Sequence, residues 1–187
     1  MRKNLGPKPY LLPQPVFIIS TYGEEGTPNA MLAVWGGISN EIEISIALPP
    51  ERKTVKNILA RGAFTVSMAD AAHVVACDYV GIVSGNKVPD KFEKAGFHAM
   101  KSEFVDAPLI EELPMALECR MKSYDAETWR MVGEIVNVSL DERILNENGK
   151  VSLTKFAQVV FDWMSKEYLK VGQKAGNAYR DGLALKR

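Results

Sequence analysis

The sequence contains little cysteine or histidine. Its two cysteines, Cys77 and Cys119, form no Cys-x-x-Cys pair, which argues against a disulfide scaffold, a zinc site and a dithiol redox motif. His73 and His98 are the only histidines, and neither has a cysteine or carboxylate at the spacing of a metal site or a catalytic triad. We therefore expect a protein from a reducing compartment, with no metal ligands and with its cysteines buried as small apolar groups.

The sequence also lacks an excess of charge and a long apolar run. Lysine plus arginine and aspartate plus glutamate number 23 each, so no overall field favours nucleic acid or an anionic membrane, and any anion site must be local. The longest apolar stretch, residues 30–38, is far shorter than the roughly 20 residues of a transmembrane helix. Prolines rather than an apolar segment follow the charged start of the chain. These features predict a cytoplasmic protein that binds neither nucleic acid nor membranes.

Dinucleotide and nucleoside-triphosphate motifs are absent. Neither G-x-G-x-x-G nor G-x-x-x-x-G-K-[ST] occurs, which excludes a Rossmann domain and a P-loop at the level of the motif. No Gly/Ser linker, charge block or repeat divides the chain, so we expect residues 1–187 to form one domain. Any nicotinamide nucleotide would then bind transiently as a substrate and would not be a permanently bound cofactor.

Short strands dominate the pattern that remains. Several apolar or alternating segments, bounded by turn residues, have the period of two that half-buried strands show. They are residues 16–20 and 31–35 on either side of a turn at 23–26, residues 42–46, 64–67, 117–121 and 129–140, and a hairpin turn at Asn148-Gly149. Many short strands with short helices between them predict a closed β-barrel and not a doubly wound sheet.

Three helices are expected between the strands. The first has Thr54 as its N-cap and Gly62 as its C-cap, and it buries Val55, Ile58 and Leu59. A second covers residues 71–83 and a third makes a turn or two within 90–96. From Ser165 onward we expect helical or irregular chain, and a helix there would carry Lys166, Lys170 and Lys174 as a basic stripe.

The start of the first helix is a candidate phosphate site. A helix N-terminus offers unpaired N–H groups and a positive dipole end. Here Arg52 adds a bidentate fork, Lys53 a point charge and Thr54 a hydroxyl. The alternative is that Thr54 only caps the helix and the two cations are solvated.

An apolar segment before a glycine pair is a candidate site for a flat ring. Trp35 ends this segment, and Gly36-Gly37 permits close approach of a backbone. The alternatives are a core aromatic for Trp35 and a turn residue for Asn29.

Read in order, several of these segments together resemble one family. They are Pro15-Val16, Pro28-Asn29-Ala30 before Trp35, Arg52-Lys53-Thr54 with Asn57-Ile58, Phe64, Ser84-Gly85 before Asp90-Lys91-Phe92, and Gly133-Glu134. The sequence is similar to the flavoredoxin and flavin reductase family over roughly residues 5–182. This resemblance implies a mainly β fold, an FMN-binding split β-barrel of Greek-key type. It also implies a homodimer with FMN near the interface, reduced by NADH, NADPH or a redox-protein donor.

The resemblance assigns the candidate cofactor residues. The loop and strand at Asn29, Ala30, Met31, Leu32, Ala33, Val34 and Trp35 would line the flavin, with Trp35 near the ring. Arg52, Lys53 and Thr54 would hold the phosphate, Ser84 belongs to the binding loop, and Lys91 would approach the isoalloxazine. The alternative for Lys91 is an exposed helical lysine. Two segments depart from the family: Thr128-Trp129-Arg130 stands where relatives have a histidine, and residues 39–42 lack the relatives' prolines.

The expected activity is transfer of electrons through FMN. Because the chemistry would take place on the flavin, no protein acid or base is required. The acceptor would be free flavin, ferric iron or a redox protein. Three alternatives stay open: an FMN electron carrier without a nicotinamide site, a flavin-sensing module, and a β-barrel whose phosphate-like motif is accidental.

Overall fold

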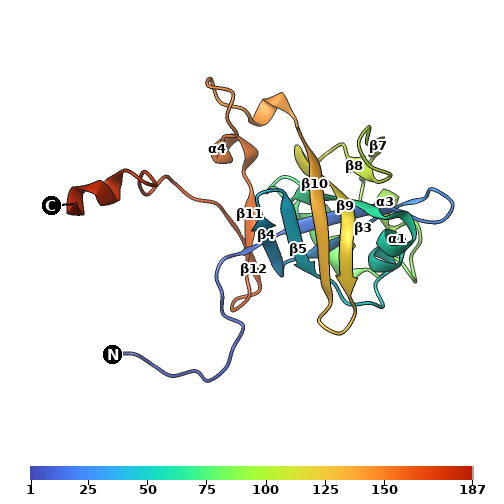
Figure 1. The fold of residues 1–187 in the computed structure, drawn as a ribbon, viewed down its shortest axis with the longest axis horizontal. Helices are drawn as coiled ribbons and strands as arrows, with labels where there is room; N and C mark the ends of the chain where they lie inside the picture. The colour runs from blue at the N-terminus through green and yellow to red at the C-terminus, as the bar shows by residue number, and fades with distance from the viewer. Residues whose placement is uncertain (187) are drawn as a thin grey trace.

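The computed structural model describes residues 1–186, and they form a mainly β structure with a few short helices (Figure 1). Its largest sheet is antiparallel and has seven strands. These are β2 (Phe17–Tyr22), β3 (Pro28–Ala33), β4 (Gly36–Asn40), β5 (Glu43–Ala47), β6 (Ala63–Met68), β9 (Met115–Asp125) and β10 (Arg130–Leu140). They lie in the order β3-β2-β6-β9-β10-β5-β4. The predicted strands are therefore confirmed, and their non-sequential order agrees with a Greek-key type of barrel.

The chain connectivity requires this sheet to curl. β3 and β4 are opposite edges of the sheet, yet only Val34 and Trp35 separate them in sequence. Three Cα steps from Ala33 to Gly36 span at most roughly 11 Å, whereas the edges of a flat seven-stranded sheet would lie roughly 29 Å apart. The two edges must therefore approach each other at Val34-Trp35, which we call the seam. The barrel is split here, because β3 and β4 meet without pairing.

The barrel interior is filled by alternate side chains of the strands. Ile44 and Ile46 of β5, Phe64 and Val66 of β6, and Met131 of β10 are all fully buried in one cluster. Gly133 faces this cluster, where a Cβ atom would collide with the ring of Phe64. The glycine of the Gly133-Glu134 pair is thus required by packing, because β10 crosses directly over an aromatic ring.

Short helices connect the strands. They are α1 (Lys53–Arg61), α2 (Val74–Ile82), α3 (Lys91–Lys94) and α4 (Leu153–Phe156), with 3₁₀ turns η1 (Glu142–Ile144) and η2 (Asp181–Leu185). As predicted, α1 ends at Gly62, whose φ of +68° is the left-handed conformation that glycine favours. The predicted N-cap is wrong: Arg52 is the N-cap and Thr54 lies inside the first turn. Leu59, which was expected to face inward, is exposed at 50%.

The chain after residue 158 differs most from expectation. Instead of a helix, residues after Asp162 turn back to form a strand, so β12 (Glu167–Lys170) pairs with β11 (Val159–Asp162), which also pairs with β1 (Gln14–Pro15). A second small sheet joins β7 (Ala99–Lys101) to β8 (Pro108–Ile110). Lys166 lies in the turn with φ +63° and Lys170 lies on a strand, so the expected basic stripe is wrong. Tertiary contacts stabilise the hairpin in place of the conformation expected from the local sequence, because Tyr168 packs on Phe161 and its hydroxyl donates to Asp78.

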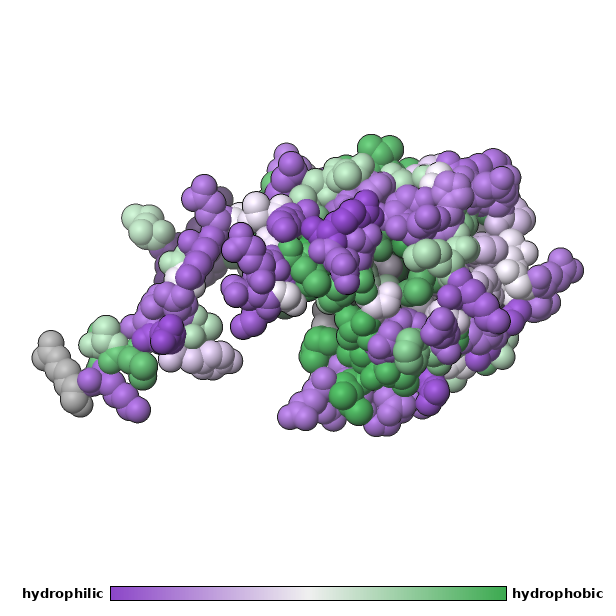
Figure 2. All heavy atoms as spheres, turned by 90° about the horizontal axis from the view of Figure 1, so that it is seen from above, coloured by the Kyte–Doolittle hydropathy of each residue, from purple (hydrophilic) through white to green (hydrophobic). Residues whose placement is uncertain are grey.

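Both ends of the chain leave the barrel on the side where β11 and β12 lie (Figure 1). The C-terminal segment stands away from the body, and its surface is mainly hydrophilic with a few apolar residues near the end (Figure 2). Within residues 1–186, no helix has the length and hydrophobicity that crossing a membrane requires.

Candidate flavin site at the seam

A pocket of about 240 Å³ lies at the seam of the barrel. We call it the seam pocket. It is lined by the β3 end and the seam (residues 31–35), the start of α1 (residues 52–54), the end of α2 with the following loop, Lys91 and Trp163. Because α1, α2 and α3 all pack against β3, residues far apart in sequence meet here. All the predicted cofactor residues line this pocket except Ala30, whose side chain is fully buried in a core cluster.

The start of α1 forms the cationic end of the pocket. Its N-cap Arg52 makes no side-chain capping hydrogen bond, and the first turn contains no acidic residue. The N–H groups of a first helical turn have no partner within the helix. Arg52 is half exposed and lies 3.8 Å from the Glu51 carboxylate, a surface pair of the kind that contributes little. The donors at this end are thus available to an anion.

Thr54 and Asn29 are coupled behind this helix start. Both are buried, and Asn29 Nδ2 donates to Thr54 Oγ1 at 2.8 Å. The interpretation of Asn29 as a simple turn residue is wrong, because it lies on β3 and orients a side chain of α1. Since Thr54 Oγ1 accepts this bond, the hydroxyl hydrogen remains free to donate into the pocket.

Glycines bring the loop after α2 close to the pocket floor. A Cβ at position 81 would lie 2.9 Å from Leu32 Cβ, and a Cβ at position 85 would collide with Asn29 Oδ1. Ser84 and Gly85 can therefore approach the helix start closely enough to line the same pocket. A side chain at position 81 or 85 would instead collide with residues of β3.

Lys91 is a buried cation in the lining of the pocket. It is only 3% exposed, so the interpretation of an exposed helical lysine is wrong. Its Nζ donates to the carbonyl oxygens of Val80 and Val83, both at 2.8 Å, at the C-terminal end of α2. Burial, and to a lesser extent the positive charge of Arg52, lowers the pKa of Lys91 to about 8. An ammonium group has three hydrogens, so one remains for a ligand.

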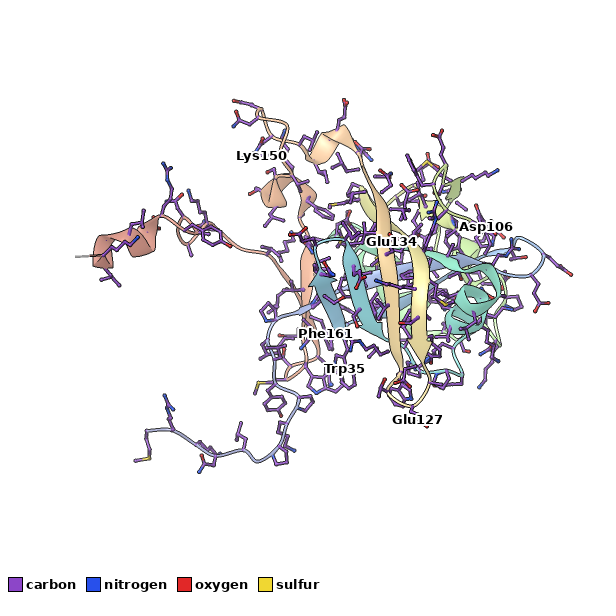
Figure 3. The ribbon with its side chains drawn as sticks, in the orientation of Figure 1. Trp35, Asp106, Glu127, Glu134, Lys150 and Phe161 are labelled. Carbon is purple, nitrogen blue, oxygen red and sulfur yellow. The ribbon has the colours of Figure 1, made fainter. Side chains whose placement is uncertain are left out.

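Aromatic side chains form the apolar wall. Trp35 is 42% exposed, which makes the interpretation as a core aromatic wrong. Its ring centroid lies 5.6 Å from that of Trp163, with the planes tilted by 49°. Trp35 and Phe161 lie on the same side of the barrel (Figure 3), and Phe161 packs edge-on against Trp163. A flat, apolar group is the natural occupant of this wall.

Sequence reasoning missed Trp163. Its only signal is a short aromatic run, Phe161-Asp162-Trp163, which precedes the segment that was expected to be helical or irregular. Because the hairpin of β11 and β12 was not predicted, nothing in the sequence placed Trp163 near Trp35.

The cysteines and histidines lie outside this pocket. Burial raises the pKa of both Cys77 and Cys119 to about 12, so neither thiol ionises near neutral pH. His73 pairs with Asp70 and His98 with Glu112. Within residues 1–186, no group of three or more histidine, cysteine, aspartate or glutamate side chains could hold a metal ion. The chemistry of the seam pocket is therefore that of cations, amides and aromatic rings.

Comparisons with known proteins agree with this architecture. The model of the flavin reductase like domain matches residues 10–158. The chain belongs to the flavin reductase-like family. A flavoredoxin of Desulfovibrio vulgaris (Miyazaki F) is 36% identical, with a TM-score of 0.92 over 97% of this chain and 100% of that one. The flavoredoxin from Methanosarcina acetivorans is 26% identical, with a TM-score of 0.87 over 99% and 100%.

More distant members of the flavin reductase-like family share the fold. An FMN-binding domain of a flavin reductases-like enzyme from Shewanella baltica OS155 is 16% identical, with a TM-score of 0.77 over 88% of this chain and 89% of that one. The split-barrel fold and the family predicted from the sequence are thus confirmed. The contacts of individual residues with a flavin stay predictions.

Proposed function

We propose that this flavin reductase-like protein binds FMN in the seam pocket and acts as an oxidoreductase. In this proposal it takes electrons from NADH, NADPH or a redox protein and passes them to free flavin, ferric iron or a protein acceptor. One observation carries the proposal: a single pocket combines an aromatic wall, a buried cation and an open helix N-terminus. FMN is itself a flat ring joined to a phosphate. A relative whose description includes FMN binding shares the fold, which also supports the choice.

The start of α1 would hold the phosphate. The first-turn N–H groups and the Thr54 hydroxyl would donate to its oxygens, while Arg52 and Lys53 would supply opposite charge. Asn29 would keep the Thr54 hydroxyl oriented through its 2.8 Å hydrogen bond. Phosphate binding of this kind orients a cofactor without taking part in electron transfer.

Trp35, Trp163 and Lys91 would set the environment of the ring. When bound, FMN supplies a ring that accepts a hydride and returns electrons to an acceptor. The two tryptophans would exclude water from one side of that ring. Lys91 would favour negative charge nearby, because its ammonium group is buried and held by two carbonyls of α2. No side chain of the pocket is needed as a general acid or base.

We further propose that the protein is a homodimer with FMN near the interface. Trp35 is half exposed at the seam, and the edge strand β4 beside it exposes Ile38 at 64%. The chain ends carry further exposed apolar side chains, among them Leu11 and Leu185. A second copy that covered these residues would remove apolar surface from water and would also close the open side of the pocket.

The visible spectrum of the purified protein tests the proposal. The protein is reconstituted with FMN, desalted, and titrated anaerobically with NADH and with NADPH. Retained flavin that bleaches with one nucleotide is the expected result, and it identifies the donor. Light scattering on the same sample measures the mass, for which we expect twice that of the 20.7 kDa chain.

Two other outcomes would replace the proposal with its alternatives. Flavin that stays oxidised with both nucleotides but bleaches with dithionite would point to an electron carrier or a sensing module without a nicotinamide site. No retained flavin and no measurable FMN affinity would mean that the pocket serves a different ligand.

A further inference from the structure

Charge is divided unequally between the ends of the chain and the barrel. Residues 1–12 contain three cationic residues and no acidic one, and residues 163–187 contain six cationic residues and two acidic ones. We call these two stretches the cationic segments. Together they carry a formal charge of +7, while residues 13–162 carry −7. The chain is neutral overall, but it consists of two strongly and oppositely charged parts.

The cations of the two segments are exposed, and they include Lys166, Lys170, Lys174 and Arg180. Within residues 1–186, no cation of these segments takes part in a salt bridge, whereas several barrel cations pair with carboxylates. The carboxylate of Asp181 accepts hydrogen bonds from the backbone and the side chain of its neighbour in the same segment. The positive charge of the segments is therefore available to a partner.

The opposite charge lies at the other end of the molecule. Both chain ends leave the barrel beside β11 and β12, whereas α3, β7, β8 and the β2–β3 turn lie at the far end (Figure 1). Exposed carboxylates gather at that far end, namely Glu24, Glu25, Asp90, Glu93, Glu103 and Asp106. An acidic partner would therefore be attracted to one end of the molecule and repelled from the other.

The cationic segments are connected with the aromatic wall of the seam pocket. Trp163, at the start of the second segment, lines that pocket. Lys166 has a φ of +63°, and its Nζ lies 3.2 Å from the centroid of the Trp163 ring. The Asp162 carboxylate fixes this turn by accepting hydrogen bonds from the Met164 N–H and the Ser165 hydroxyl. A partner held by the segments would thus lie beside a side chain of the proposed flavin site.

We propose that the cationic segments form the docking surface for an acidic electron-transfer protein that donates electrons to the flavin. This inference rests on the proposed flavin function and specifies the chemistry of its protein donor. Two one-electron donors are needed for each FMN, because each gives up one electron and the ring takes both, together with protons from water. Opposite charge would steer the donor to this end of the molecule and raise its association rate.

A compact acidic protein fits this surface better than a nucleic acid or an anionic membrane. A large polyanion that extended over the barrel would be repelled by its charge of −7. Leu11, Tyr179 and Leu185 are exposed apolar side chains among the cations, a mixture that is typical of protein interfaces. Because lysine and arginine side chains are long, the segments can also contact a second copy of the chain and keep their charges in water.

Reversal of charge tests the docking surface. The test variant is Lys170→Glu with Lys174→Glu, since both lysines are exposed and lie outside the seam pocket. Lys94→Glu with Lys101→Glu is the matched control, because it makes the same change in charge at the acidic end. The probe is an acidic [2Fe–2S] ferredoxin that has been reduced beforehand. Stopped-flow absorbance gives its rate of reduction of bound FMN at about 0.1 M salt, where charges more than about 10 Å apart are largely screened.

We expect ferredoxin to reduce the FMN of the wild type, at a rate that falls as the salt concentration rises. The test variant should react about tenfold more slowly or worse, and the control should stay within about threefold of the wild type. Calorimetric titration of ferredoxin into the flavin-free proteins should give the same order of affinities, which measures docking independently of FMN. FMN affinity and reduction by dithionite should be equal in all three proteins.

Several results would overturn the inference while leaving the FMN site intact. They are equal slowing in both double variants, and a wild type that ferredoxin neither binds nor reduces. A test variant that is monomeric by light scattering, beside a dimeric control, would assign the segments to the second copy. Heparin or phosphatidylserine vesicles that bind the wild type more tightly than ferredoxin does would assign them to a polyanion or a membrane. Absence of any flavin binding in the wild type would overturn the proposed function, and the inference with it.

Discussion

The barrel core and the seam pocket use the same strands for opposite purposes. In the core, Phe64 is fully buried and β10 crosses it so closely that position 133 must be glycine. In the seam pocket, Trp35 is half exposed, the first turn of α1 has no capping side chain, and Lys91 retains a hydrogen to donate. Core groups find their partners within the chain, whereas pocket groups keep binding capacity. The core therefore determines stability, and the pocket determines what binds.

Removing a core side chain should have the largest effect, and it tests whether stability and binding depend on separate parts of the molecule. Phe64→Ala should lower the free energy of unfolding by about 3–5 kcal/mol, because it removes a large buried ring and leaves a cavity. Gly133→Ala should cost about 1–3 kcal/mol through overpacking against that same ring. Urea denaturation measures both. Below the denaturation midpoint, the folded fraction of each variant should keep its FMN affinity, and a large loss of affinity would show that core and pocket are not separate.

The phosphate end of the pocket provides the next largest effect. Arg52→Ala together with Lys53→Ala should weaken FMN binding tenfold or more, because charge-assisted hydrogen bonds contribute about 1.5–3 kcal/mol each. Riboflavin, which lacks the phosphate, should lose far less. Lys56→Ala is the control on the same helix, since Lys56 is exposed and does not line the seam pocket. Equal losses for FMN and riboflavin would contradict the assignment of the phosphate.

The ring end can be separated from the phosphate end. Trp35→Leu should weaken FMN and riboflavin to the same extent, by a factor of roughly 5–10, because base-like rings gain about 1–3 kcal/mol from stacking on an aromatic side chain. Stability should change by less than about 1 kcal/mol, since Trp35 is half exposed. Titration with both flavins and urea denaturation measure the two quantities. A loss confined to FMN would place Trp35 away from the ring.

Lys91 should make the pocket sensitive to pH. Its pKa of about 8 lies below the value of about 10.5 expected in the unfolded chain, so the unfolded state binds more protons between these values. The ligand-free protein should therefore gain stability as the pH rises from about 8 to 10.5, by at most about 1.4 kcal/mol per pH unit. FMN affinity should fall over the same range, because deprotonation of Lys91 removes a positive charge from the pocket that holds the FMN anion.

Lys91→Met removes this titration and is the variant that tests it. Both the stability slope above pH 8 and the pH dependence of FMN affinity should disappear, as measured by denaturation and titration between pH 7 and 10. Lys94→Met, an exposed change on the same short helix, should leave both slopes unchanged. Persistence of the slopes in Lys91→Met would assign them to another group.

Local sequence pattern predicted the barrel, and the resemblance to a known family supplied most of the candidate pocket residues. Neither predicted how the pocket closes. Two features depend only on neighbours in sequence, so pattern and propensity predicted them. They are the alternating burial of Ile44 and Ile46 on β5 and the C-cap of α1 at Gly62. The pairing of β11 with β12 depends on Tyr168 reaching Phe161 and Asp78, contacts between distant segments that no local rule contains. Trp163 was missed for that reason.

Most of the remaining differences between the expected and the observed site concern which side chains are buried. The sequence does not show whether Lys91 or Trp35 is buried, since both types occur inside and outside proteins. The structure buries Lys91 against the end of α2 and exposes Trp35 at the seam. Thr54 was predicted as a cap from its position before an apolar repeat, but Arg52 ends the extended segment two residues earlier. The residues that were predicted together still meet, because α1, α2 and α3 all pack against β3.

A crystal structure of the protein with bound FMN tests the central claim most directly. The account predicts the phosphate at the first turn of α1, within hydrogen-bond distance of Thr54, and the ring against Trp35 near Lys91. A flavin bound elsewhere on the barrel would contradict it.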